Sequence, residues 1–317
     1  MIGALLESKY RVPLRRPDAI ARPRLGERLS AASRSALTVV SAPAGFGKTT
    51  VLTEWLATVG DARSIAWLSL DHRDNDPGPL WTYVIAAMQT ATDGVGAAAL
   101  QLLASSPPST EAALAALLNE LNGLPKDLLL VLDDYHVIDA PEVHDGLRFL
   151  LDHQPPRLHL ILATRTDPPL PLARMRARGR LVEVRAADLR FTADESAAYL
   201  NGAMGLALSE RDVVALDGRT EGWIAALQLA ALSMQDREDA GAFIAGFAGD
   251  DRYIVDYLVE EVLARQPADI RDFLLKTSVL ERLAGPLCDA VTARGGGKAT
   301  LVALERANLF LVPLDDR

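Results

Sequence analysis

The sequence predicts an α/β protein built on a five-stranded parallel sheet. Short apolar runs alternate with helical patterns between residues 37 and 185, as expected when helices cover both faces of a parallel sheet. A glycine-rich loop separates the first apolar run from a helical stretch, and a later apolar run ends in two aspartates. The predicted strands are Leu37–Ser41, Ser64–Leu70, Leu128–Asp133, Leu158–Thr164 and Leu181–Arg185.

Composition limits the classes of protein to consider. The chain has 317 residues, of which 49% are hydrophobic and 24% charged, so it is long enough for two or three folded domains. A formal net charge of −9 argues against nucleic-acid binding by the chain as a whole. The single cysteine, Cys288, excludes an internal disulfide and a multi-cysteine metal site. Because no apolar run reaches membrane length, we expect a cytoplasmic protein without a membrane partner.

Helical patterns dominate outside the strands. Between the second and third strands, helices are predicted at Pro79–Thr90 and Thr110–Leu121. After the fifth strand the clearest helical patterns are Thr192–Asn201, Ser209–Asp217 and Gly222–Met234. Thr192 and Glu195 form a capping-box pattern, and Ser209 is suited to cap the next helix. We therefore expect a small helical domain after the sheet.

A third unit is expected from Asp251 onward. Its predicted helices are Tyr253–Arg265, Asp269–Thr277, Pro286–Thr292 and Ala299–Ala307, and a predicted strand, Leu309–Val312, follows them. This order resembles the front part of a winged helix. The predicted organisation is therefore an N-terminal linker at residues 1–36, an α/β core at 37–188, a helical arm at 189–236 and a truncated winged-helix-like domain at 250–317.

The glycine-rich loop at residues 42–49 reads Ala-Pro-Ala-Gly-Phe-Gly-Lys-Thr, a P-loop pattern with alanine in its first position. Its glycines allow backbone N–H groups to turn toward phosphate oxygens at a helix N-terminus. We expect Lys48 to reach the β- and γ-phosphates of ATP, and the Thr49 hydroxyl to ligate Mg²⁺. The alternative is a tight turn that holds no ligand. The predicted nucleotide-binding residues are Ala44, Gly45, Phe46, Gly47, Lys48, Thr49 and Thr50.

Two aspartates, Asp133 and Asp134, end the wholly apolar run that starts at Leu128. A carboxylate at the carboxyl end of a parallel strand can hold Mg²⁺ beside the β- and γ-phosphates, and we assign this role to Asp133. We assign Asp134 the catalytic role of accepting a proton from the attacking water, where an Asp in place of Glu leaves hydrolysis slow. The alternative is an Asp-Asp turn that caps the next helix.

Arg165 follows the next predicted strand, Leu158–Thr164. In P-loop proteins with an extra strand between the loop strand and the strand that ends in the aspartates, this edge faces the γ-phosphate. We therefore predict that Arg165 distinguishes ATP from ADP by bonding only to the third phosphate. The alternative is a solvated arginine in front of the turn formed by Asp167, Pro168 and Pro169.

Several ordered motifs together resemble one family. They are Ser41–Thr50, Ala66–Asp71, Asp74–Pro77, Leu132–His136, Ala163–Arg165, Pro168–Leu170, Arg22–Leu25 and Thr220–Leu229. These stretches are similar to those of the MalT-like large LuxR-family activators, which belong to the STAND class of signal-transducing P-loop ATPases. The resemblance covers essentially the whole chain.

This resemblance implies a nucleotide-binding core of the AAA-like (ASCE) type, a helical arm and a winged helix that close around ADP in a resting state. ATP exchange would open them and allow self-association. It further implies that Arg22–Leu25 and Gly222–Ile224 lie near the base, although many members of the class have Pro where Ile224 stands. The inducer and DNA sites are expected in C-terminal regions outside this chain.

Three functions follow as hypotheses from the sequence. We prefer an ATP/ADP-binding switch that controls opening and oligomerisation, with at most weak ATPase activity. A fast AAA-like ATPase that acts on a macromolecule is disfavoured because neither an arginine finger nor a Glu beside Asp133 is evident. DNA binding through the winged helix is disfavoured because residues 269–312 have balanced charges, while the basic stretch from Arg11 to Arg28 lies at the other end of the chain.

Overall fold

The computed structural model describes residues 5–32, 35–106, 109–234, 240–246, 252–280 and 282–307, together with Leu309 and Leu311. The chain divides into two compact units. The first unit consists of Met1–Ser41 and Lys48–Asp188, and the second consists of Ala42–Gly47 and Leu189–Arg317. The P-loop is thus divided after Gly47: residues 42–47 group with the second unit, and Lys48 and Thr49 belong to the first.

The first unit contains a five-stranded sheet with the strand order β2-β3-β4-β1-β5, and all four strand pairs are parallel. The strands are β1 (Leu37–Ser41), β2 (Ser64–Ser69), β3 (Leu128–Asp133), β4 (Leu158–Thr164) and β5 (Leu181–Arg185). The predicted α/β core is confirmed, and β4 is the extra strand between β1 and β3. The three central strands are completely buried, which explains their continuous apolar sequences.

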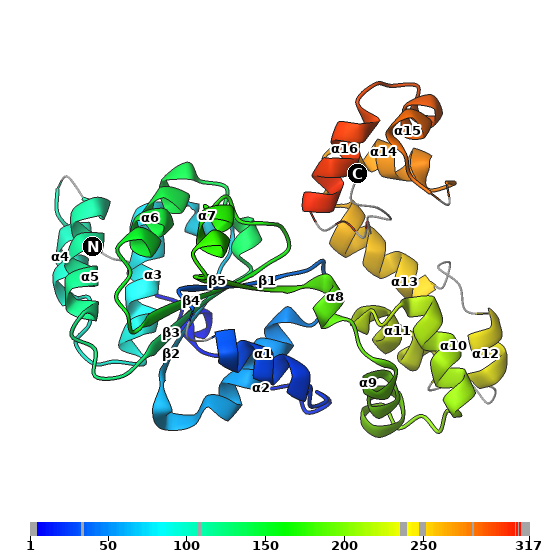
Figure 1. Ribbon diagram of the computed structural model, residues 1–317, viewed down its shortest axis with the longest axis horizontal. Helices are drawn as coiled ribbons and strands as arrows, with labels where there is room; N and C mark the ends of the chain where they lie inside the picture. The colour runs from blue at the N-terminus through cyan, green and yellow to red at the C-terminus, as the bar shows by residue number, and fades with distance from the viewer. Residues whose placement is uncertain are drawn as a thin grey trace. The chain divides into compact units, whose positions relative to one another are not determined.

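Helices cover both faces of this sheet (Figure 1). One face carries α1 (Pro23–Ala32) and α2 (Lys48–Val59), and the other carries α3 (Pro77–Gln89), α6 (Pro141–Asp152) and α7 (Leu172–Ala177). The remaining elements of this unit are α4 (Ala97–Leu103), α5 (Thr110–Leu121), the short 3₁₀ turns η1 (Glu7–Tyr10), η2 (Gly60–Ala62), η3 (His72–Asn75) and η4 (Tyr135–Val137), and α8 (Ala186–Leu189), which runs into the second unit. Side chains of β1 such as Leu37 and Val39 pack with α3 and α6 in one large core.

A buried lysine ties the N-terminal segment to the sheet unit. Lys9 Nζ lies 2.6 Å from a carboxylate oxygen of Asp74 and 3.0 Å from one of Asp71, and it stands 4.7 Å from the ring centroid of Tyr83. Only 8% of Lys9 is exposed, so its charge requires these partners. Residues 1–36 were predicted to be a linker near the nucleotide base, and this anchor was not anticipated.

The described part of the second unit is helical. Its elements are α9 (Ala193–Ala197), the π-helical segment η5 (Ala198–Ala203), α10 (Glu210–Thr220), α11 (Ile224–Met234), α12 (Ala240–Gly246), α13 (Arg252–Tyr257), the π-helical segment η6 (Leu258–Leu263), α14 (Ala268–Thr277), α15 (Gly285–Thr292) and α16 (Gly297–Arg306). Both hydrogen bonds of the predicted capping box between Thr192 and Glu195 are present, and Ser209 caps α10. Of the predicted strand Leu309–Val312, only Leu309 and Leu311 are described, and neither is in a strand; the rest lies outside the described residues.

Phe273, Cys288 and Leu304 form a small buried cluster among α14, α15 and α16. Cys288 is fully buried in this cluster, where it packs as a small apolar residue. Within the described ranges of the chain, no helix has the length and apolar character required to cross a membrane.

Candidate nucleotide-binding site

The loop at residues 42–47 connects β1 directly to α2, in the order that the sequence predicts. Gly45 has φ +77° and Gly47 has φ +70°, a region that residues with side chains rarely adopt. Ala44 and Phe46 are buried, and Thr50 is half-buried in the first turn of α2. The two glycines therefore permit a compact turn that leads into the N-terminus of α2, a place that suits an anion.

Lys48, the first residue of α2, is a buried cation with 8% of its surface exposed. Burial lowers the pKa of its ammonium group to about 8, and the positive charge of Arg165 acts in the same direction. The carboxylates of Asp134 and Asp133 oppose this shift without cancelling it. An anion bound beside Lys48 and Arg165 would relieve the repulsion between them, so these residues form an anion site from two separate elements.

Asp133, the last residue of β3, lies beside Thr49. The Thr49 hydroxyl donates a hydrogen bond of 2.8 Å to Asp133 Oδ2, and the backbone N–H of Asp134 donates one of 3.0 Å to Asp133 Oδ1. Burial and then the charge of Asp134 raise the pKa of Asp133 to about 6, against the effect of these hydrogen bonds and of Lys48. A hydroxyl and a buried carboxylate fit Mg²⁺, which is commonly held by one or two protein oxygens together with phosphate and water.

Asp134 occupies the start of the turn that follows β3. Its φ of +57° is unusual for a residue with a side chain, and its side chain is 48% exposed. Asp134 Oδ1 lies 3.7 Å from Nδ1 of His136. The structure thus places Asp134 next to Asp133 but in a more solvated position, so the two carboxylates differ in environment.

Arg165 directly follows β4 and is half-buried. Its charge lowers the pKa of Lys48, so it faces the same region as the P-loop lysine. The strand order explains this proximity, since β4 is the direct neighbour of β1 and both run parallel. The first unit therefore brings together Lys48, Thr49, Asp133, Asp134 and Arg165.

Residues 42–47 have close contacts within the second unit. Trp223 Nε1 donates to the carbonyl oxygen of Ala44 at 3.2 Å, and the backbone N–H of Ala225 donates to that of Gly45 at 3.1 Å. A Cβ atom on Gly45 would lie 2.5 Å from Ala225 Cβ and 2.9 Å from the Tyr257 hydroxyl. The backbone at Gly45 is thus enclosed by side chains of α11 and α13.

These loop contacts were not predicted from the sequence, in which Gly222–Ile224 were expected near the base by resemblance and Tyr257 had no expected role. The Trp223 and Tyr257 rings lie 5.8 Å apart, and Trp223 lies 6.5 Å from the Phe46 ring. No local pattern could have indicated a bond between residues separated by 179 positions. The Cδ1 atom of Ile224 lies 3.1 Å from where a Cβ of Gly47 would be, and the expected proximity of Ile224 to the base stays a prediction.

The segment Arg22–Leu25, also expected near the base by resemblance, consists of the residue before α1 and the first three residues of that helix. The side chain of Arg24 donates to the backbone oxygen of Asp188, and Leu25 is buried. These contacts give the segment a fixed place in the first unit. Its proximity to a nucleotide base stays a prediction.

A family model described as the MalT winged helix domain matches residues 259–317 of the chain. The curated relatives include proteins named HTH-type transcriptional regulator MalT from Yersinia enterocolitica, Serratia proteamaculans and Cronobacter sakazakii, which are 37%, 38% and 36% identical over 315, 316 and 320 residues. Each alignment covers 98% of this chain but only 34–35% of the relative. The chain therefore spans about a third of the length of these regulators.

Two solved structures have a similar fold. A Walker-type ATPase of Pyrococcus abyssi matches with a TM-score of 0.59 and 17% identity, over 94% of this chain and 92% of that one. A STAND protein with a tetratricopeptide repeat sensor from Pyrococcus horikoshii matches with a TM-score of 0.51 and 15% identity, over 94% and 40%. They share the P-loop ATPase fold. The two structures show the fold of the chain, and the sequence relatives show that 98% of the chain is similar to a stretch that makes up about a third of the regulators named MalT.

Proposed function

We propose that the chain is the ATP- and ADP-binding switch module of a transcription regulator. One observation carries the proposal: Arg165 directly follows β4, the neighbour of the P-loop strand β1, and its positive charge adds to burial in lowering the pKa of Lys48 at the start of α2. A second cation beyond the P-loop lysine is the group needed to detect a further phosphate. The names of the relatives support the regulatory part of the proposal.

In this proposal the amides of residues 44–49 and Lys48 bind the β-phosphate. Thr49 and Asp133 would hold Mg²⁺, which supplies positive charge to the phosphates when it is bound. Arg165 pairs with the γ-phosphate, which ADP lacks. Because a ligand shifts a conformational equilibrium only through its different affinities for the two states, this contact is the source of switching.

Hydrolysis is proposed to be slow. Asp134 would accept the proton of the attacking water, but its carboxylate is about half exposed and shorter than that of a Glu. Slow hydrolysis suits a switch, because the ATP-bound state then persists long enough to assemble with other copies.

In this proposal, exchange of ADP for ATP opens the chain and allows it to associate with other copies. Inducer and DNA would be bound by parts of the regulators that this chain does not span. A regulator of transcription works in the compartment that holds the DNA, so in bacteria we place it in the cytoplasm.

The test compares ATP and ADP affinities of the chain with those of Arg165→Gln. We expect ATP affinity to fall about 10-fold or more, since a hydrogen bond to a charged group contributes about 1.5–3 kcal/mol, with little change for ADP. Arg174→Gln is the matched control, because Arg174 is a half-exposed arginine of α7 that pairs with Asp152. An equal loss for both nucleotides would remove the role of Arg165 as a γ-phosphate detector.

Self-association is tested separately by sedimentation at one protein concentration with ATP, with ADP and without nucleotide. We expect a larger mass with ATP only. The same mass in all three samples would contradict the link between nucleotide state and assembly.

A further inference from the structure

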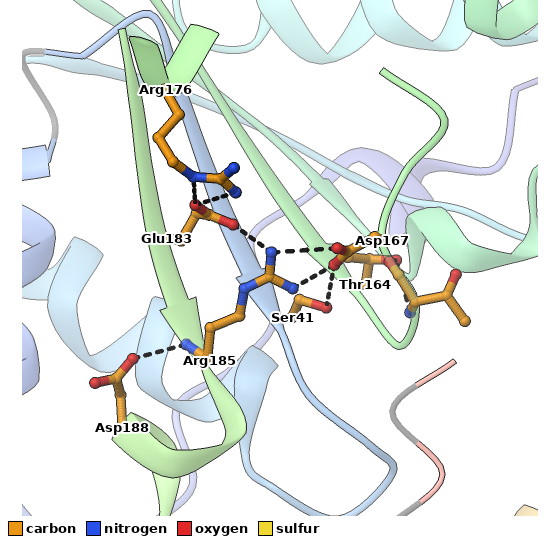
Figure 2. A network of polar contacts seen from close by, with 8 residues as sticks. Ser41, Thr164, Asp167, Arg176, Glu183, Arg185 and Asp188 are labelled. Carbon is orange, nitrogen blue, oxygen red and sulfur yellow. Dashed lines mark hydrogen bonds and ion pairs between the residues drawn. The ribbon is translucent and has the colours of Figure 1, made fainter. Parts of the chain in front are cut away.

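A network of charged side chains joins the carboxyl ends of β1, β4 and β5 (Figure 2). At its centre is Arg185, the last residue of β5. Its guanidinium donates to both carboxylate oxygens of Asp167, with Nη2 3.3 Å from Oδ2, and also donates to Glu183. The Ser41 hydroxyl, 3.5 Å from Asp167 Oδ1, adds a longer contact. Ser41 is the last residue before the P-loop.

The other members of the network hold Arg185 in place. Glu183 accepts a second hydrogen bond, 2.8 Å long, from Arg176 Nε. Burial alone would raise the pKa of Glu183, but the hydrogen bonds from Arg185 and Arg176 lower it overall, so Glu183 stays ionised. Asp188 accepts from the backbone N–H of Arg185 at 2.8 Å and pairs with Arg28 of α1 at 2.6 Å. The side chain and the backbone of Arg185 are thus both fixed.

The turn after β4 is held at its two ends. The Thr164 hydroxyl donates to the carbonyl of Thr166 at 2.7 Å and accepts from the N–H of Thr166 at 3.3 Å. Asp167, at the other end, is held by Arg185. Arg165 lies between these two attachments, so its backbone position is determined by the fully buried Thr164 and by the ion pair of Asp167.

The location separates this network from an ordinary surface ion pair. In parallel sheets, ligands bind at the carboxyl ends of the strands, and Ser41, Thr164 and Arg185 stand at the same level in the strand register. Arg165 directly follows β4 in the same turn, so the position of this backbone decides where its guanidinium can lie.

We propose that Asp167 and Arg185 are positioning residues that act through Arg165. Their ion pair holds the turn after β4 in a fixed place relative to the end of β1, where Ser41 leads into the P-loop. The guanidinium of Arg165 then meets a γ-phosphate without reorganising the turn. This inference rests on the proposed function, because it assigns the network to discrimination between ATP and ADP.

The experiment measures the ratio of ATP to ADP affinity in Asp167→Asn, Arg165→Gln and the double variant. Asp167→Asn keeps the size of the side chain and removes its charge. We expect it to weaken ATP binding about 3- to 10-fold and to leave ADP binding within about twofold. The effect on ATP is limited because the bond between Arg165 and the γ-phosphate is misplaced rather than deleted. In the Arg165→Gln background it should change the ratio no further, since two residues that act as a unit are not additive.

Two variants serve as controls. Asp152→Asn removes the carboxylate of a comparable ion pair, between Asp152 of α6 and Arg174 of α7, and should leave the ratio unchanged. Arg185→Lys keeps the charge but loses the bidentate bond to Asp167. Its ratio of ATP to ADP affinity should lie between those of the unmodified chain and Asp167→Asn. Thermal unfolding of each variant identifies any that is not folded, and Arg185→Lys then replaces Asp167→Asn in the comparison.

The outcomes separate this inference from the proposed function. If Arg165→Gln lowers the ratio but Asp167→Asn does not, the positioning role is overturned and the proposed function stands. If Arg165→Gln itself leaves the ratio unchanged, both are overturned. The positioning role also fails if Asp167→Asn weakens ATP and ADP equally, or if it still lowers the ratio in the Arg165→Gln background.

Discussion

The two parts of the P-loop, which belong to different compact units, have different chemical surroundings within their own units. The first unit contributes charged groups, namely Lys48, Asp133, Asp134 and Arg165. Within the second unit, the described hydrogen bonds to the carbonyls of residues 42–47 come from uncharged donors, the Trp223 indole and the Ala225 amide. Charges respond to the number of phosphates on a ligand, whereas bonds to the backbone carbonyls fix the shape of the loop.

This difference means that charge recognition and loop shape can be separated by mutation. Substitutions among the charged groups should change affinity by an amount that depends on the phosphates they contact. Substitutions around Trp223 and Ala225 should affect ATP and ADP alike, because both nucleotides use the same loop. Three variants test this comparison.

Lys48→Ala is expected to have the largest effect. The buried ammonium would bond to phosphates that ATP and ADP share, so both affinities should fall about 100-fold or more, for a loss of about 3 kcal/mol. Titration calorimetry measures the change. Lys126→Ala, at an exposed position, is the control. Unchanged affinity for both nucleotides would refute the assignment of charge recognition to the first unit.

Gly45→Ala should have the next largest effect. Its φ of +77° costs a residue with a side chain about 1–2 kcal/mol, and the new Cβ would lie 2.5 Å from Ala225 Cβ. We expect ATP and ADP affinities to fall together, by about 10-fold or more. Titration of both nucleotides tests this.

Gly94→Ala is the matched control for Gly45→Ala, because Gly94 has the same φ with nothing within 4 Å of a Cβ. It should lower the thermal stability through the backbone alone and leave nucleotide affinity intact. A loss of ATP binding without a loss of ADP binding in Gly45→Ala would show that loop shape and charge recognition are not separable.

Trp223→Phe should have the smallest effect of the three. It keeps an aromatic ring but removes the donor to Ala44, which contributes about 1 kcal/mol or about fivefold in affinity. The loss should be the same for ATP and ADP in a fluorescent-nucleotide competition assay. Trp55→Phe removes a similar indole bond, to the Ser30 hydroxyl, and should not alter either affinity. A change in the ATP to ADP ratio for Trp223→Phe would contradict the comparison.

The fold of the first unit was largely predictable. All five strands were located within one residue, and α5 was predicted at its observed bounds, Thr110–Leu121. Strands buried on both faces have unmistakable apolar runs, and Ser109 caps α5 by a local bond to Ala112. The helix predicted at Tyr253–Arg265 is instead α13 followed by a π-helical segment, a change of hydrogen-bonding register that periodicity does not reveal.

The sequence identified individual residues of the candidate site but not the partners that hold them in place. Its motif indicates Lys48, Thr49 and Asp133, because phosphate and metal chemistry require those groups at strand ends. The motif does not indicate Arg185 as the partner of Asp167, since each of them alone resembles a solvated charge. Trp223 likewise has an ordinary core pattern in the sequence.

The sequence by itself determined the strands, the helix caps and the glycines of the loop, because these depend on interactions within a few residues. Only the tertiary structure decided which distant groups meet. The parallel order β4-β1-β5 aligns Thr164, Ser41 and Arg185 at one edge, and the packing of α11 brings Trp223 to Ala44. Such pairings depend on strand order and helix packing, which no local pattern of residues encodes.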